Sequence, residues 1–309
     1  MDLHGKAVLV TGASSGVGFA AAEAFARAGA DVAVTARSVD GLERAAARVR
    51  AQGRRAVVVP ADVSDREAVN AMVAKATQEL GALHVVCLCA AVVVFGGFDE
   101  VEPDDFDRVI DVTFGGPVNV VRAALPELER TGGRIVSVGS LMSKLPLPQL
   151  SSYSAAKHAE RGFLNTLRVE LKAKRSKVEI SQLHPGAINT PIWSDMPSAN
   201  GFLPRKPPEG YSATQVAEEL VLLARNPTAE RTFGLETQAL EFLFNQVRPA
   251  GDLVLVMINH YFRSGRKVSQ SGLTALTEAV GEGISRGSIP FERPSITRTL
   301  SRVASRVWP

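Results

Sequence analysis

The fold of this chain is decided near its N-terminus by the stretch VLVTGASSGVG, residues 8–18. An apolar strand leads into a glycine-rich turn, and an alanine-rich helix follows to about residue 28. Gly12 permits the tight turn, Gly16 lets the backbone approach a pyrophosphate, and Gly18 lets the helix pack closely on the strand. A glycine cluster alone also suits a plain strand-to-helix turn, but this order of elements favours a dinucleotide site.

Two further features favour phosphate binding at this turn. The N-terminus of the following helix attracts anions, because its first backbone N–H groups have no partner within the helix and its dipole is positive there. Ser14 and Ser15 add hydroxyl donors. We therefore predict that the phosphates of a dinucleotide bind here.

Strands and helices alternate along the first 240 residues, which is typical of an α/β fold with a parallel sheet. After the first strand at 7–10 we expect strands at 31–35, 56–60, 85–89, 134–140, 179–183 and 232–235. We expect helices at 39–52, 103–130, 153–172 and 212–225, and we expect Pro117 to perturb the second of these. Residues 1–240 form one cofactor-binding domain in this interpretation, and 241–309 form a C-terminal extension.

The second expected strand ends at Ala36-Arg37-Ser38, close to the position where an acidic residue would hold the ribose hydroxyls of NAD. No acidic residue stands there. The planar guanidinium of Arg37 instead suits the 2′-phosphate of NADP, to which it can donate two charge-assisted hydrogen bonds. We expect NADP(H), with NAD(H) as the alternative, because an arginine on the solvated surface would look the same in the sequence.

Tyr153 and Lys157 are four residues apart in an expected helix, so the phenol and the ammonium share one face. A free tyrosine titrates near pH ~10 and is a poor acid or base at neutral pH. A unit charge about 4 Å away, at an effective dielectric constant of ~20, is worth roughly 4 kcal/mol, or about three pKa units before desolvation. Lys157 is therefore expected to activate Tyr153, although the same spacing also arises by chance in helices.

Ser140 ends an expected strand and precedes Tyr153 by a proline-containing loop. The two residues can meet at the carboxyl edge of the sheet, where open α/β folds bind ligands. A serine at a strand end is by itself an ordinary turn hydroxyl. Beside Tyr153 it becomes a candidate for stabilising a substrate oxygen.

Composition excludes several classes of protein. Hydrophobic residues make up 45% of the chain and charged residues 22%, and the longest apolar run, residues 85–98, is too short and too rich in glycine to span a membrane. The first 240 residues are nearly neutral, so no electrostatic footprint for nucleic acid is present.

Cys87 and Cys89 could share a soft metal on one face of a strand, but buried, reduced cysteines are expected and no metal site is predicted. We find no signal peptide and expect a cytoplasmic protein.

Together these residues resemble the short-chain dehydrogenase/reductase family over about residues 3–235. The resemblance rests on Thr-Gly-x-x-x-Gly-x-Gly at 11–18, on Ser140 with Tyr153 and Lys157, and on Pro-Gly at 185–186 with Thr190 after it. It implies a Rossmann-type, doubly wound parallel sheet of seven strands with helices on both faces. It also implies a nicotinamide cofactor, hydride transfer to or from a carbonyl or alcohol, and a homodimer or homotetramer.

The resemblance assigns roles to particular residues. It implies that Ser140 stabilises the substrate oxygen, that Tyr153 is the acid or base, and that Lys157 lowers the pKa of Tyr153 and binds the nicotinamide ribose. Ile188 and Thr190 are implied to hold the carboxamide of the nicotinamide. The residues expected to contact the cofactor are Gly12, Ser14, Ser15, Gly16, Val17, Gly18, Arg37, Asp62, Val63, Ala90, Tyr153, Lys157, Pro185, Gly186, Ile188 and Thr190. Asp62 has a second interpretation as the cap of the helix that follows it.

Two positions depart from the pattern of the family. The family's Asn-Asn-Ala-Gly segment reads Leu-Cys-Ala-Ala at 88–91, and the family's catalytic helix asparagine is replaced by Thr113. In the family the asparagine holds a water in the proton relay beyond the lysine. A threonine hydroxyl is shorter but still donates and accepts hydrogen bonds. We therefore expect a reduced or differently relayed activity.

Residues 190–211 are rich in proline and glycine and include Trp193, Met196 and Phe202. The family has its substrate-covering segment at this place, and a loop of this length is commonly functional. The apolar side chains favour a rather apolar substrate. A loop that packs on the core would explain them equally well.

The extension 241–309 contains nine Lys or Arg residues against five acidic ones. In 296–308, arginines recur at every fourth residue opposite apolar side chains, which predicts a basic amphipathic helix. Contact with a membrane surface is one interpretation, and docking on the body or on a partner subunit is the other.

Three functions therefore remain open from the sequence. The first is an active NADP(H)-dependent oxidoreductase, favoured because Ser140, Tyr153 and Lys157 are all present. The second is a cofactor-binding sensor or scaffold with little turnover, suggested by Thr113. The third is a membrane-associated reductase of lipid-like substrates, which depends on the extension alone.

Overall fold

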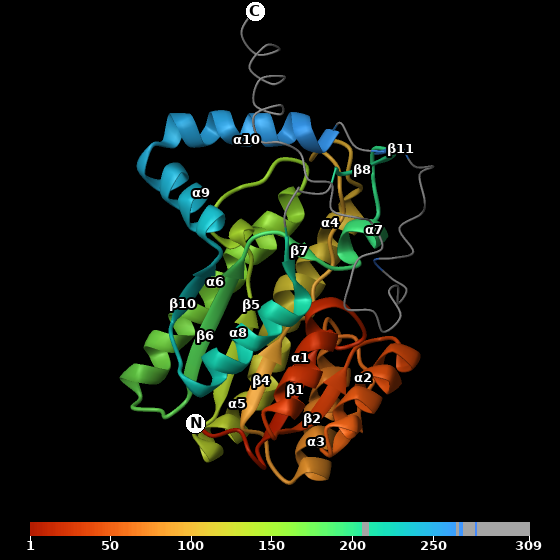
Figure 1. Cartoon of the computed structure of the whole chain (residues 1–309), viewed down its shortest axis with the longest axis vertical. Helices are drawn as coiled ribbons and strands as arrows, with labels where there is room; N and C mark the ends of the chain where they lie inside the picture. Colours follow the sequence, from red (N-terminus) through yellow and green to blue (C-terminus); the bar gives the residue numbers. More distant parts are fainter. Residues whose placement is uncertain (206–209, 264–265, 268–275, 277–309) are drawn as a thin grey trace, which may run out of the picture.

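The computed structural model describes residues 1–205, 210–263, 266–267 and 276. In these residues one sheet of seven parallel strands has the order β10-β6-β5-β4-β1-β2-β3 (Figure 1). The strands are β1 Ala7–Thr11, β2 Asp31–Thr35, β3 Ala56–Val58, β4 Val85–Leu88, β5 Arg134–Val138, β6 Glu179–Pro185 and β10 Glu230–Phe233. The doubly wound, Rossmann-type sheet predicted from the sequence is confirmed. Its strand order reverses between β1 and β4, and ligands bind at such a switch point.

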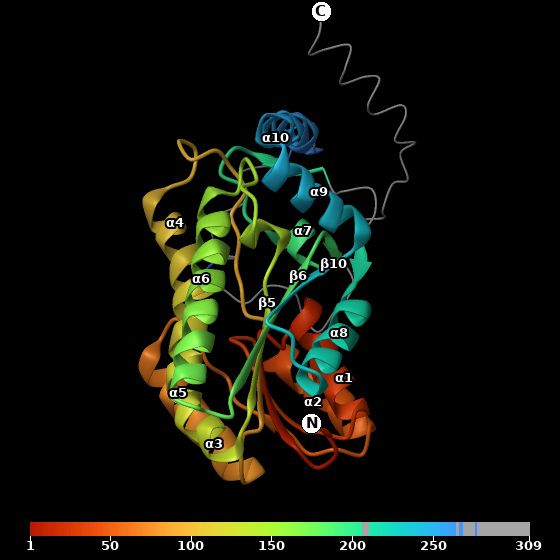
Figure 2. The same ribbon diagram turned by 90° about the vertical axis from the view of Figure 1, so that its left-hand side faces the viewer.

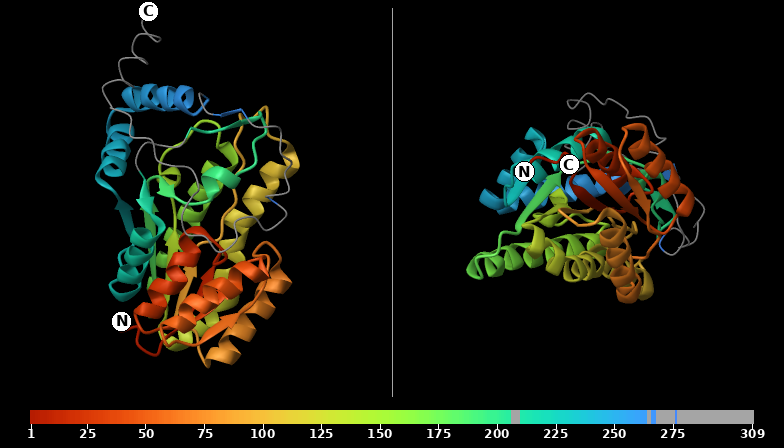
Figure 3. Two further views of the ribbon diagram at one scale, coloured as in Figure 1. Left: turned by 45° about the vertical axis from the view of Figure 1, so that its right-hand side comes forward. Right: turned by 90° about the horizontal axis from the view of Figure 1, so that it is seen from below.

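Helices cover both faces of the sheet (Figure 2). On one face lie α1 Gly16–Arg27, α2 Val39–Ala51 and α8 Ala213–Arg225. On the other lie α3 Arg66–Leu80, α5 Gly116–Thr131 and α6 Ser151–Ala173. Seen from below in Figure 3, the sheet lies between these two layers.

The two apolar layers follow from the alternation of side chains along each strand. In β1, Val8 and Val10 pack against the layer of α1, whereas Leu9 packs against the layer of α3. Because both faces are covered, the central strands are apolar at nearly every position. A continuous apolar run such as that of β1 therefore indicates a central parallel strand.

The helical stretch expected at 103–130 is interrupted. Helix α4 Pro103–Ile110 leads into a π-helix, Asp111–Gly115, before α5 begins. The N–H of Gly116 donates to the carbonyl of Asp111, five residues back. Pro117 follows and has no N–H to donate, so its expected perturbation coincides with the change from the π-helix to α5. Thr113 lies within the π-helix.

Shorter elements build the end of the molecule beyond the carboxyl edge of the sheet. They are α7 Ile192–Asp195 and two small sheets, formed by β7 Ile188–Asn189 with β9 Tyr211–Ser212 and by β8 Phe202–Leu203 with β11 Arg266–Lys267. Helices α9 Leu235–Gln246 and α10 Arg248–Arg263 lie across this end (Figure 1). Leu145, before α6, packs against Phe244 of α9 and Leu255 of α10.

The end of the last strand differs from the expected one. The last strand ends at Phe233 and not at 235, because Gly234 has φ +105° and α9 begins at Leu235. Helix α9 runs across residue 240, and the division into 1–240 and 241–309 stays a prediction. The basic helix expected at 296–308 lies outside the described residues. Among the helices that the structure describes, none is long and apolar enough to cross a membrane.

Candidate active site

The glycine turn after β1 is shaped by contacts that exclude side chains. Gly12 has φ +65°, and a Cβ there would lie 2.8 Å from Cα of Ala90. Gly16 has φ +56°, and a Cβ on Gly18 would lie 2.3 Å from the carbonyl oxygen of Gly12. The Ser15 hydroxyl makes no capping hydrogen bond to α1, so the first N–H groups of this helix have no side-chain cap. This turn fits the phosphates of a dinucleotide, because uncapped N–H groups bind anions.

One cavity of about 700 Å³ extends from this turn along the carboxyl edge of the sheet. It brings together all the residues predicted to contact the cofactor, and also Ser140. Thr113 is the one predicted site residue that does not line it. The cavity thus combines a phosphate-binding end with a candidate catalytic end.

Arg37 lies half-buried at the phosphate end. Its Nη1 donates to the carbonyl oxygen of Leu276 at 2.7 Å, and Nε of Arg108 donates to the same oxygen at 3.2 Å. Two guanidinium groups thus face one oxygen acceptor, which is the kind of partner that a phosphate offers. Sequence reasoning missed Arg108, because it comes from α4 and nothing near it in the chain marks it.

Asp62 faces the same end, and its interpretation as a helix cap is not supported. The cap of α3 is Asp65, whose carboxylate accepts from the N–H groups of Glu67 and Ala68. Asp62 instead accepts from Ser64 and forms an ion pair with Arg108. Burial would raise the pKa of Asp62, but these hydrogen bonds hold it below its ordinary value. Asp62 is therefore an anion at the phosphate end of the cavity.

Tyr153 and Lys157 project from α6 towards the ends of β5 and the following turn. Nζ of Lys157 lies 5.9 Å from the centroid of the Tyr153 ring and donates to the carbonyl of Val138 at 2.9 Å. Burial raises the pKa of Tyr153, Lys157 lowers it as expected, and Glu160 raises it again. The net pKa is above the ordinary value of tyrosine, because burial and Glu160 outweigh Lys157 and a hydrogen bond with Ser140.

Ser140 is held at the start of a 3-10 turn, Leu141–Ser143. Its Oγ accepts from the N–H of Met142 at 3.1 Å, and its own N–H donates to Oγ of Ser143 at 3.1 Å. Because these bonds fix the turn, the Ser140 hydroxyl is directed towards Tyr153 in the cavity.

Both departures from the family pattern take part in hydrogen bonds that sequence reasoning did not find. The hydroxyl of Thr113 donates to the carbonyl of Val92 at 3.0 Å and accepts from its N–H at 3.1 Å. Oγ1 of Thr11 accepts from the N–H groups of Cys89 and Ala90 at 3.0 and 3.2 Å. Thr113 and Thr11 thus both hold the loop after β4 by hydrogen bonds to its backbone. A relay role for Thr113 stays a prediction.

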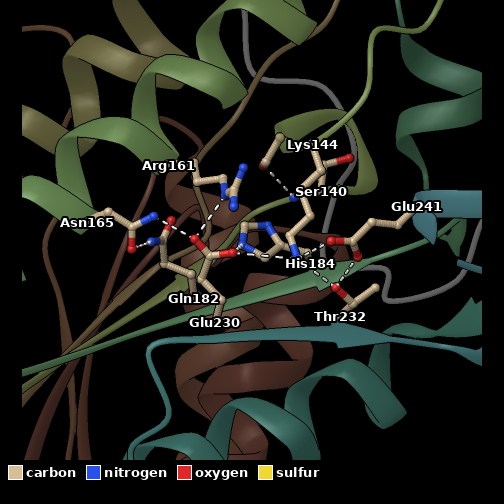
Figure 4. A network of polar contacts seen from close by, with 10 residues as sticks. Ser140, Lys144, Arg161, Asn165, Gln182, His184, Glu230, Thr232 and Glu241 are labelled. Carbon is tan, nitrogen blue, oxygen red and sulfur yellow. Dashed lines mark hydrogen bonds and ion pairs between the residues drawn. The ribbon is translucent and has the colours of Figure 1, made fainter. Parts of the chain in front are cut away.

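Behind Ser140 lies a polar network that joins β6, β10, α6 and α9 (Figure 4). Nζ of Lys144 donates to Oγ1 of Thr232 at 2.8 Å and to Oε1 of Glu241 at 2.9 Å. The fully buried ring of His184 lies 3.7 Å from Glu230 and packs on Gly139, whose Cβ would come within 2.4 Å of Nδ1. Burial, helped by Lys144, lowers the pKa of His184 to about 4, so the ring is neutral at pH 7.

The other half of the cavity is apolar. Its lining includes Met142, Leu147, Trp193, Met196, Ile258 and Phe262. Trp193 is fixed because its Nε1–H donates to the carbonyl of Ile188 at 2.8 Å. Phe262 comes from α10 and packs edge-on against Phe95 with 6.4 Å between ring centroids. The extension therefore contributes directly to the wall of the cavity.

Cys87 is buried and the sulfurs of Cys87 and Cys89 lie 3.5 Å apart. The hydrogen bond between the two thiols and burial raise the pKa of Cys87. Within the part of the chain that the structure describes, no group of three or more His, Cys, Asp or Glu side chains is placed to hold a metal ion.

Comparisons with known proteins agree with this geometry. A family model described as short chain dehydrogenase matches residues 6–201. The uncharacterized oxidoreductase YxnA of Bacillus subtilis is 31% identical over 78% of this chain and 68% of its own. Dehydrogenase/reductase SDR family member 7B of Rattus norvegicus is 31% identical over 71% of this chain and 70% of its own.

Among solved structures, an alcohol dehydrogenase from the archaeon Thermococcus sibiricus, complexed with 5-hydroxy-NADP, is similar to this chain. The TM-score is 0.66 at 31% sequence identity, and the match covers 74% of this chain and 95% of the other. The seven-stranded sheet, the glycine turn and the matched family model lead to one conclusion. The chain belongs to the short-chain dehydrogenase/reductase family of oxidoreductases.

Proposed function

We propose that this protein is an NADP(H)-dependent oxidoreductase that transfers a hydride between nicotinamide and a carbonyl or alcohol substrate. The observation that carries the proposal is the single cavity, which joins the glycine turn to Ser140, Tyr153 and Lys157. The nicotinamide supplies or accepts the hydride when the cofactor is bound. The chain supplies the proton, the stabilisation of charge on oxygen and the exclusion of water.

In the direction of reduction, Tyr153 gives its hydroxyl proton to the carbonyl oxygen of the substrate as hydride reaches the carbonyl carbon. The Ser140 hydroxyl donates a hydrogen bond to this oxygen, on which negative charge develops. The phenolate of Tyr153 then regains a proton from solvent, and Lys157 stabilises it in the interval. In oxidation each of these transfers runs backwards.

Preference for NADP(H) rests on Arg37 and Arg108, which face one oxygen acceptor at the phosphate end of the cavity. The archaeal relative was solved with an NADP derivative, which is consistent with this preference. A rather apolar substrate is supported by the side chains of the other half of the cavity. We also propose that the protein is cytoplasmic. We further propose a homodimer or homotetramer assembled through α4–α5 and α6, which is supported by Val169 of α6, an apolar side chain that is 57% exposed.

A sensor or scaffold with little turnover is the second candidate. It is favoured by one observation, namely that the Thr113 hydroxyl is engaged with the backbone of Val92 on both its donor and acceptor sides. The membrane-associated reductase rests on 296–308, which lie outside the described residues, and no observation in the structure adds to it.

A panel of apolar aldehydes, ketones and alcohols, followed at the nicotinamide absorbance, tests the proposal. We expect turnover with NADPH or NADP and a loss of at least about a hundredfold in kcat for Tyr153→Phe, which removes the proton donor. The matched control is Tyr211→Phe, because Tyr211 also bears a phenol but donates to Glu236. Tight binding of NADPH without turnover on any substrate would favour the sensor instead.

A further inference from the structure

Glu160 is a buried carboxylate placed directly on the candidate catalytic lysine. Its Oε2 lies 2.7 Å from Nζ of Lys157, and the side chains of Glu160 and Lys157 are 2% and 3% exposed. Its other oxygen, Oε1, accepts from the hydroxyl of Ser137 on β5. Burying a carboxylate is costly unless it is paired and hydrogen-bonded, and Glu160 meets both conditions inside α6 and β5.

The helix period explains how three such groups come together. Tyr153, Lys157 and Glu160 follow one another at spacings of four and three residues, so all three lie on one face of α6. An ammonium has three N–H donors. One is used by the carbonyl of Val138 and one by Glu160, which leaves one for the cavity.

We infer that Glu160 is a positioning residue for Tyr153 and Lys157: its carboxylate pairs with the ammonium and keeps Tyr153 in the phenol form that donates a proton to a carbonyl. The inference rests on the proposed function and specifies its direction. A lysine without an anion would stabilise the phenolate, which accepts the proton of an alcohol during oxidation. A lysine paired with a carboxylate presents less positive charge to Tyr153, so this stabilisation is weakened.

The other groups around Tyr153 leave this balance in place. Burial raises the pKa of Tyr153 most, Lys157 lowers it, Glu160 raises it, and the hydrogen bond with Ser140 lowers it. Burial lowers the pKa of Lys157, but Glu160, Tyr153 and Cys89 raise it, and the net pKa is above the ordinary value of lysine. Glu160 is thus the carboxylate that opposes Lys157 at Tyr153, and Lys157 stays protonated beside it.

A spectroscopic titration of the full chain tests the inference without any turnover. The chain has three tyrosines, so the phenolate absorbance of one residue can be followed in the near ultraviolet as pH rises. We expect one phenolate to form at least about one pH unit lower in Glu160→Gln than in the unmodified protein, because one carboxylate charge is removed. The same shift should be absent from Glu160→Gln/Tyr153→Phe, which assigns it to Tyr153.

Asp31→Asn is the matched control, because Asp31 is a buried carboxylate paired with Arg54 and Arg55 and does not line the cavity. It should lose stability without moving the phenolate titration. If Glu160→Gln does not fold, Lys157→Met/Glu160→Leu removes both charges and keeps an apolar pair in their place. Its Tyr153 should then titrate as high as in the unmodified protein, and an early phenolate there would overturn the inference.

Kinetics provide a second measurement. Alcohol oxidation by Glu160→Gln should reach half its maximal rate about one pH unit lower than in the unmodified protein, while the KM for NADP changes less than about threefold. Glu160→Asp should restore the original profile in part. An unchanged phenolate titration in Glu160→Gln contradicts the role of Glu160, whereas absent turnover with a shifted titration contradicts the proposed function alone.

Discussion

The ammonium of Lys144 lies 2.9 Å from Oε1 of Glu241, and this pair joins the turn that follows Ser140 to helix α9 (Figure 4). The same ammonium donates to Thr232 of β10, whose hydroxyl donates to the other oxygen of Glu241 at 2.7 Å. The side chain of Lys144 is only 9% exposed. The extension is therefore attached to the candidate catalytic end of the cavity by polar contacts as well as by the packing of Leu145.

This attachment predicts energetic coupling between Lys144 and Glu241. Lys144→Met and Glu241→Gln should each destabilise the protein, and the double variant should be less destabilised than the sum of the two, by about 1–3 kcal/mol. Denaturation by urea of the four proteins gives this coupling. In each variant kcat should fall while the KM for NADPH changes less. The reason is that the Ser140 turn loses its support, whereas the phosphate end of the cavity does not. Additive effects would show that the pair contributes nothing to the turn.

Arg37 is predicted to set the preference for NADPH. Arg37→Asp should reduce kcat/KM for NADPH by at least about a hundredfold and raise that for NADH, since a carboxylate repels the 2′-phosphate and accepts from ribose hydroxyls. Steady-state kinetics with both cofactors measure the ratio. Arg50→Asp, which changes an exposed arginine paired with Glu43 outside the cavity, is the control. An unchanged ratio in Arg37→Asp would contradict the assignment.

Gly18 is predicted to admit no larger residue. A methyl group there would meet the carbonyl oxygen of Gly12 at 2.3 Å, so Gly18→Ala must displace the turn or α1. We expect NADPH binding, followed by fluorescence, to weaken at least tenfold and the free energy of unfolding to fall by about 1–3 kcal/mol.

Gly162→Ala is the matched control for this substitution. Gly162 lies within α6, and a Cβ there would have no atom within 4 Å. Alanine should stabilise the helix at that position by up to about 1 kcal/mol. Equal losses of NADPH binding in Gly18→Ala and Gly162→Ala would mean that the close approach at Gly18 is not needed.

His184 is predicted to make the stability of the fold depend on pH. Its pKa is about 4 in the folded protein, because the ring is buried beside Lys144, and about 6.5 in an unfolded chain. Between these values the unfolded chain binds the proton more readily, so stability rises with pH. On acidification from pH 6.5 to 4 the protein should therefore lose about 3 kcal/mol from this group.

The groups that face His184 from neighbouring elements are Lys144, Glu230, Arg161 and Glu241. The pKa of Glu230 is about 2, because hydrogen bonds from Arg161 and Asn165 outweigh its burial, so its contribution is lost from about pH 4.5 downwards and overlaps the range of His184 only at the acidic end. In His184→Asn the slope of the unfolding free energy between pH 6.5 and 4 should be clearly smaller. Urea denaturation at several pH values measures it, and equal slopes in both proteins would disprove the role of His184.

The sequence by itself determined the parts of this protein that depend on local patterns. The strand, glycine turn and helix at 7–28 were recognisable because a tight turn restricts which residues can occupy it. The residues predicted to contact the cofactor line one cavity, because most of them follow strands whose carboxyl ends reach the same edge of the sheet. That they bind a cofactor stays a prediction. The doubly wound sheet of seven parallel strands followed from the family resemblance, which these short patterns carried.

The tertiary structure alone decided the relationships between residues that are distant in the chain or that belong to no pattern. Arg108 meets Arg37 through the carbonyl of Leu276, and Lys144 meets Glu241 across 97 positions. Glu160 is only three residues from Lys157, yet the buried ion pair between them depends on β5, which covers that face of α6. The hydroxyl of Ser137 on β5 also donates a hydrogen bond to Glu160. Spacing along the chain predicts which side chains share a face. Only the packing of one element on another removes water from that face, and the loss of water is what makes the charges there act strongly on each other.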